Sequence, residues 1–165
     1  MQIKRLEPHE WQAYKTLRLE ALQTEPQAFC STYPDFCDRP DAYWQARLEE
    51  AAQGQGSWLL FAAEGSRLVG MIGAALLPEQ PGTASVVAMY VTPAARGRQV
   101  ARALLEAVLQ ELKGYGLRRA QLEVNREQGA ALALYTRAGF RQTQSGRFTM
   151  GDGAEHELLS MEIEL

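Results

Sequence analysis

The sequence contains few cysteines and histidines and has no long apolar run. Only two of its 165 residues are Cys and two are His. Cys30 and Cys37 lie seven residues apart, a spacing that matches no zinc or redox motif, so we expect no metal and interpret both as plain thiols. No stretch approaches the roughly 18 apolar residues of a membrane-spanning helix, and the N-terminus lacks the apolar core of a signal peptide. The prediction is a cytoplasmic protein that makes no use of a membrane.

The sequence also lacks an excess of positive charge. Its 17 Lys and Arg and 20 Asp and Glu give a net charge of −3, whereas a nucleic-acid-binding face normally makes a domain basic. Nucleic acid is therefore not expected as the main partner. The 46% hydrophobic and 22% charged content is ordinary for a globular protein, and the length suits one core. We predict a single domain over residues 1–165 and leave open whether it forms a homodimer.

Local patterns predict a chain in which strands outnumber helices. Apolar residues spaced at the helical period predict helices over 8–24, 40–52, 100–113 and 129–138. Apolar and alternating runs between turn residues predict strands over 2–6, 57–64, 67–77, 84–92, 120–124, 140–149 and 156–165. Hairpins come first and a strand–helix–strand unit lies in the middle. The predicted class is therefore α+β, with a mixed, mostly antiparallel sheet flanked by helices.

A turn between a strand and a helix near the middle of the chain has the features of an anion-binding site. After Pro93 the chain runs through Arg96-Gly97-Arg98-Gln99 into the helix that begins at Val100. The first N–H groups of a helix lack internal partners, and the helix dipole adds positive charge there. A glycine permits close approach, and neighbouring arginines add positive charge. The alternative is a solvated arginine-rich loop that caps a surface helix.

Two motifs in this region resemble the signatures of the GNAT acetyltransferases. The first is V-x-P-x-x-R-G-x-x-x-A from Val91 to Ala101. The second is L-E-V followed by A-x-x-L-Y-x-x-x-G-F, ending at Phe140. They occur in the family's order and at its usual separation. The resemblance covers Leu68–Phe140 and, more loosely, Met161–Leu165.

This resemblance implies the GNAT (acyl-CoA N-acyltransferase) fold, with acetyl-CoA as cosubstrate. The implied activity is N-acetyl transfer to a primary amine, on a small molecule or a peptide N-terminus, by direct transfer through a tetrahedral intermediate. A non-catalytic domain that senses acyl-CoA is the alternative interpretation.

The resemblance also implies a set of cofactor-binding residues. The end of the strand at Met89–Val91 should pair its backbone with the pantetheine arm, and the amides of the turn should hold the pyrophosphate. Gln99 replaces a family glycine. Its amide can still donate if its φ stays negative, so we expect a weaker or altered phosphate geometry but no loss of the site. Either Asn125, by residue type, or Gln128, by spacing, should touch the cofactor, unless both are plain turn residues. The expected set is Met89, Tyr90, Val91, Arg96, Gly97, Arg98, Gln99, Val100, Ala101, Arg102, Asn125, Gln128, Ala131, Leu134 and Tyr135.

Two residues are candidates for the chemistry. By resemblance, Tyr135 donates a hydrogen bond to the leaving sulfur; otherwise it is a core tyrosine. Glu123 lies 12 residues before Tyr135, the spacing of the family's N-terminal alanine acetyltransferases, where such a glutamate is a general base acting through water. Its alternative role is a structural carboxylate paired with an arginine. The segment Phe29–Phe36 should set specificity, either by holding a cationic amine on aromatic and acidic side chains or by core packing alone.

Overall fold

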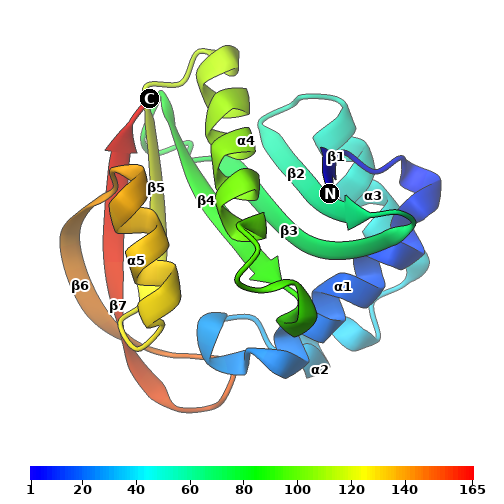
Figure 1. Cartoon of the computed structure of the whole chain (residues 1–165), viewed down its shortest axis with the longest axis horizontal. Coiled ribbons are helices and arrows are strands. Elements are labelled where there is room, and N and C mark those ends of the chain that lie inside the picture. The colour runs from blue at the N-terminus through cyan, green and yellow to red at the C-terminus, as the bar shows by residue number, and fades with distance from the viewer.

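The computed structural model describes residues 1–165 and contains one seven-stranded sheet with helices on both faces (Figure 1). The strands are β1 (Gln2–Lys4), β2 (Ser57–Glu64), β3 (Arg67–Leu76), β4 (Thr83–Val91), β5 (Arg119–Asn125), β6 (Arg141–Thr149) and β7 (Glu155–Glu164). Their order is β1-β2-β3-β4-β5-β7-β6. Only β4 and β5 run parallel, and every other pair is antiparallel. The predicted α+β class with a mostly antiparallel sheet is confirmed.

The helices are α1 (Trp11–Thr24), α2 (Tyr33–Cys37), α3 (Asp41–Ala52), α4 (Val100–Tyr115) and α5 (Gly129–Ala138). Pro8–Glu10 forms a separate 3₁₀ turn before α1. The sequence analysis did not predict α2, although the side chain of Thr32 caps it by accepting from the Asp35 N–H. Helix α4 continues through Gly114 and ends at Gly116, whose φ of 98° is left-handed. Glycine adopts that conformation without strain, so the second of the two glycines ends the helix.

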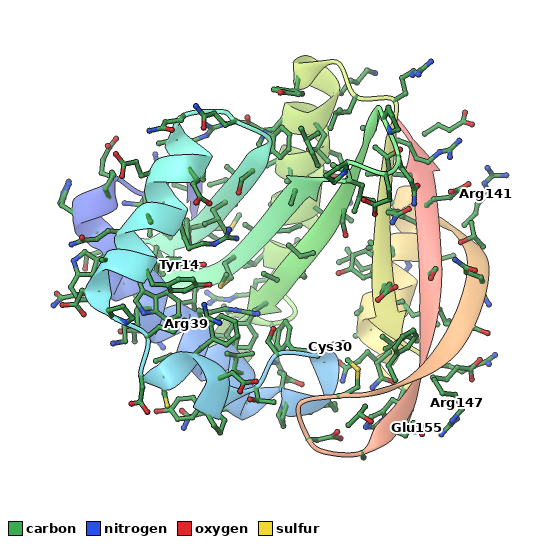
Figure 2. The ribbon with its side chains drawn as sticks, turned by 180° about the vertical axis from the view of Figure 1, so that it is seen from behind. Tyr14, Cys30, Arg39, Arg141, Arg147 and Glu155 are labelled. Carbon is green, nitrogen blue, oxygen red and sulfur yellow. The ribbon has the colours of Figure 1, made fainter.

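Each face of the sheet carries its own core, because successive side chains of a strand point to opposite faces. On one face, buried residues such as Leu60 pack with Leu104 of α4. On the other face, Phe61 packs with Tyr14 of α1 and Trp44 of α3. Figure 1 shows α4 and α5 in front of the sheet, and Figure 2 shows the opposite face with α1 and α3. No helix combines the length and the apolar character that crossing a membrane would require.

Candidate active site

The parallel strands β4 and β5 separate after a short paired stretch. They pair only over Thr83–Ser85 and Arg119–Gln121. A bulge at Ala88, whose φ is 56°, shifts the register between β3 and β4 and adds local twist. The second half of β4 therefore has no partner on its β5 side, and its free backbone groups can pair with another extended chain.

The three residues expected to offer this edge, Met89–Val91, lie in that unpaired half. Met89 is half-buried against the core under α4, while Tyr90 and Val91 are buried. The Tyr90 side chain points to the opposite face, and its hydroxyl lies 2.9 Å from Oε1 of Glu20 on α1, to which it donates. Burial, and after it the Glu20 carboxylate, raises the pKa of Tyr90 to about 12. The Tyr90 side chain therefore joins β4 to α1.

The turn before α4 presents a row of unpaired backbone donors. None of the N–H groups from Gly97 to Arg102 donates to a carbonyl, and the first bond of the helix is Ala103 N–H to Gln99 O. Gly97 has a φ of +76°, and a Cβ on it would meet no atom within 4 Å. Val100 is buried, Ala101 is half-buried, and Arg98, Gln99 and Arg102 are exposed. Neighbouring amides that include left-handed residues form a concave nest suited to an anion.

The condition that Gln99 keeps a negative φ is not met. Gln99 is the N-cap of α4 with φ 61° and ψ 17°, and its side chain makes no capping hydrogen bond. The buried side chains of Val100 and Leu104 fix where α4 begins. Arg96 is extended, with φ −67° and ψ 155°, so only residues 97–99 are left to turn the chain into the helix. Two of these three residues are left-handed. The family resemblance places a glycine where this chain carries a strained glutamine.

The three arginines of the turn are not free, which the sequence did not indicate. Arg96 contacts Glu25 at 2.6 Å, Arg98 contacts Glu64 at 3.0 Å, and Arg102 contacts Glu106 at 2.7 Å. Arg96 also donates from Nε to the Val91 carbonyl at 3.1 Å, which ties the turn to the end of β4. Exposed ion pairs are worth about 1 kcal/mol or less. A bound phosphate can therefore compete with these glutamates.

Tyr135 lies on α5 and is buried, with 6% of its surface exposed. Its ring packs edge-on against Phe140, with the centroids 5.8 Å apart. Burial raises the pKa of Tyr135 to about 12, so the hydroxyl keeps its proton at neutral pH and acts as a donor. Ala131 and Leu134, on the same helix, are half-buried against the same core.

Glu123 lies on β5 on the face opposite Leu122 and Val124, as alternation predicts. It is exposed, pairs in register with Ser160 of β7, and forms none of the ion pairs of the chain. Its charge acts on Cys30: partial burial and, after it, the Glu123 carboxylate raise the pKa of that thiol. The carboxylate is therefore accessible and lies beside the segment that follows α1.

Asn125 ends β5 and is buried, with 2% exposed. Its amide nitrogen donates to the Gln27 carbonyl at 3.0 Å, and its amide oxygen accepts from the Glu127 N–H at 3.0 Å. Both polar atoms of the side chain are thus already bonded within the protein. Gln128, the other residue considered for the cofactor, is half-buried at the N-cap of α5 without a side-chain cap.

Residues Glu25–Ala28, here called the strap, join the two sides of the splayed strands. Glu25 binds Arg96, which follows β4, and the Gln27 carbonyl accepts from Asn125 of β5. These contacts join residues 71 and 98 positions apart, so no local pattern in the sequence could reveal them. The strap places the segment after α1 over the region where Glu123 is exposed.

The family model and the sequence relatives that match this chain are all acetyltransferases. Residues 13–140, well over half of the chain, match the model of the acetyltransferase (GNAT) family. A 68-residue segment is 38% identical to an IAA acetyltransferase of Azospirillum brasilense, covering 41% of this chain and 44% of that protein. A 94-residue segment is 32% identical to N-acetyltransferase 8B of Rattus norvegicus, covering 55% of this chain and 41% of that protein. The matches thus span less than half the length of either relative.

The same fold occurs in the structure of yncA from Salmonella typhimurium with its cofactor acetyl-CoA. That structure aligns with a TM-score of 0.82 at 21% identity, over 100% of this chain and 94% of that one.

Proposed function

Because this chain belongs to the acetyltransferase (GNAT) family, we propose that it transfers the acetyl group of acetyl-CoA to the nitrogen of a primary amine. The observation that supports this most is the turn before α4, where the amides from Gly97 to Arg102 have no partner. These amides follow the unpaired half of β4 along the chain, after the short turn at Pro93–Ala95. In this proposal residues 1–165 act as one acetyltransferase domain.

The chain's own groups match the shape of the cosubstrate. The amides of the turn would hold the two phosphates, and the absence of a side chain at Gly97 leaves room for them. The backbone of Met89–Val91 would hold the extended arm as an added strand. Arg96, Arg98 and Arg102 would supply charge once their glutamate partners are displaced.

Tyr135 would donate a hydrogen bond to the sulfur as negative charge develops on it. Full proton transfer would be uphill, because the phenol has a pKa of about 12 and a thiol one near 8.5. That gap corresponds to roughly 5 kcal/mol at about 1.4 kcal/mol per pKa unit. The hydroxyl would therefore act by stabilising charge in the transition state rather than by giving up its proton.

Glu123 would accept the proton of the attacking amine through a water molecule. The carboxylate is exposed and forms no ion pair. It lies on the same side of β5 as Asn125, whose amide holds the strap through Gln27. Those features leave it free to accept a proton, as a general base must. The amine would then approach from the side of the sheet that α1 and α3 cover.

The experiment is a thiol-release assay with acetyl-CoA and a panel of polyamines, amino acids and short peptides, preceded by native mass spectrometry for bound CoA. With an accepted amine, Tyr135→Phe should lower kcat by about 10²–10⁴-fold and change the Kd of acetyl-CoA little, because the ring remains. Tyr115→Phe is the control, since Tyr115 is 50% exposed on α4.

Equal kcat values for wild type and Tyr135→Phe, in an assay limited by chemistry, would remove the hydroxyl from the mechanism. Tight CoA binding without acetylation of any amine would favour the acyl-CoA sensor instead.

A further inference from the structure

Arg18 of α1 is a half-buried cation without an anionic partner. Its Nη1 atom is inaccessible to solvent and has no acceptor, and the side chain forms no hydrogen bond or ion pair. Its guanidinium lies over the Phe29 ring, 4.8 Å from the centroid. The titratable groups that act on it are Tyr14, Tyr43 and Arg47, none of which is a carboxylate. Burial accordingly lowers the pKa of the Arg18 guanidinium.

A second arginine and a buried indole lie in the neighbouring cluster of Phe36, Tyr43 and Trp44. Arg39 stacks on the rings of Phe36 at 4.3 Å and Tyr43 at 4.4 Å, and it donates only to the backbone carbonyl of Asp35. The indole N–H of Trp44, also buried in this cluster, has no acceptor either.

Asp35, the acidic residue of the segment Phe29–Phe36, already has a hydrogen-bond partner. The Asp35 carboxylate accepts from the Thr32 hydroxyl at 2.6 Å, and the Asp35 N–H donates to that hydroxyl, which caps α2. Within the segment Phe29–Phe36 the only carboxylate, that of Asp35, is therefore already hydrogen-bonded. The aromatic rings of that segment contact arginines of this chain.

A buried charge without a partner is costly, and a cation–π contact offsets about 2 kcal/mol of that cost at best. A carboxylate satisfies a guanidinium better than any other common group, because its two oxygens match two parallel N–H donors. The guanidinium of Arg18, which has no hydrogen-bond or ion-pair partner and whose Nη1 is buried, therefore suits a planar anionic ligand.

Arg18 lies on the acceptor side of the candidate active site. Phe29, which covers its guanidinium, is followed by Cys30, the neighbour of Glu123. The Phe29 carbonyl also accepts from the Gly151 N–H at 2.7 Å, which holds the segment against the loop before β7. Figure 2 shows Tyr14 and Arg39 on the face covered by α1 and α3, and Cys30 toward β5. The Phe29 ring over Arg18 thus belongs to the same segment as Cys30, on whose thiol the Glu123 carboxylate acts.

We propose that Arg18, held over the Phe29 ring, binds the carboxylate of the acceptor, so that the acceptor is a small amino acid or a close analogue. The identification of this ligand as the acceptor rests on the proposed acetyl transfer. The binding of a carboxylate at Arg18 does not.

The test measures binding rather than turnover, on the full chain saturated with CoA. Calorimetric titrations compare L-phenylalanine, L-leucine, L-methionine, L-lysine and L-glutamate, each with its carboxamide. At least one free acid should bind tenfold or more tightly than its carboxamide. In Arg18→Met that preference should fall below threefold. In Arg141→Met it should remain, because Arg141 is an exposed residue on the distant edge strand β6 (Figure 2).

The outcomes separate this inference from the proposed function. If no acid is preferred to its carboxamide in the wild type, or if the preference survives in Arg18→Met, the inference is overturned, whatever the protein acetylates. Acid binding that depends on Arg18 without acetylation of those acids would support the site and count against the proposed function. The comparison of acid with carboxamide in the wild type needs no variant, so misfolding of Arg18→Met cannot obscure it.

Discussion

Replacing Gln99 by glycine should stabilise the protein, because Gln99 is left-handed, with a φ of 61°. An L-residue pays roughly 1–2 kcal/mol to adopt that conformation, and glycine pays nothing. Glycine costs about 0.5–1 kcal/mol more in chain entropy on folding. The glutamine side chain makes no capping hydrogen bond, so no contact of that kind is lost. The net gain should be about 0.5–1 kcal/mol.

Thermal unfolding and CoA calorimetry measure the two consequences of Gln99→Gly. For a chain of this length, 1 kcal/mol moves Tm by about 2–4 °C, so Tm should rise by roughly 1–4 °C. The affinity for CoA should stay the same or increase, since the amide of residue 99 remains. Gln99→Ala is the matched control, because it removes the side chain and keeps the strained backbone, and its Tm should not rise.

Two results would refute this reasoning. A lower Tm in Gln99→Gly would mean that the left-handed conformation is not costly at this position. A loss of CoA affinity of tenfold or more, equal in Gln99→Gly and Gln99→Ala, would mean that the glutamine side chain itself contacts the cofactor.

Two further variants test the turn and the base. Gly97→Asp should weaken CoA binding roughly a thousandfold by calorimetry, since like charges about 4 Å apart cost on the order of 4 kcal/mol. Gly97→Asn is the neutral control. Equal CoA affinities of the wild type and both variants would place the phosphates elsewhere. Glu123→Gln should lower kcat near pH 7 and regain activity as pH rises, because more of the amine is then deprotonated without help. A pH–rate profile parallel to that of the wild type would remove Glu123 from the proton transfer.

Much of the fold was predictable because its signals are local. The helix over 100–113 was predicted from its apolar period, and the structure extends it only to Tyr115. The helix from Gly129 to Ala138 has the predicted bounds. The hairpin of β2 and β3 follows from two apolar runs around Gly65-Ser66. In each case one contiguous segment contains the pattern and the residues that end it.

The helix α2 had a local signal that was overlooked. Thr32, Pro34 and Asp35 form a capped start, with Pro34 in the first turn. Its five residues are too few for a helical period to be visible, so capping chemistry was the only evidence in the sequence.

The candidate site was predictable only in part, because its hydrogen bonds and ion pairs join segments that are far apart in the sequence. The turn at Gly97 and the motif around Tyr135 are contiguous, and the sequence located both. The conformation of Gln99 depends on where Val100 and Leu104 are buried, which is a tertiary constraint. The contacts of Asn125 with Gln27 depend on sheet topology in the same way.

The arginines illustrate why residue type alone does not identify an anion site. Arg96, which the motif singles out, already has Glu25 as a partner at 2.6 Å, so a phosphate there must displace a carboxylate. Arg18, which no motif marks, has no carboxylate among the groups that act on it. An anion at Arg18 displaces nothing and removes a desolvation cost that the folded chain already bears. The availability of a cation is therefore set by its partners in the fold, and the lack of a partner at Arg18 is the reason for proposing an anionic group on the acceptor.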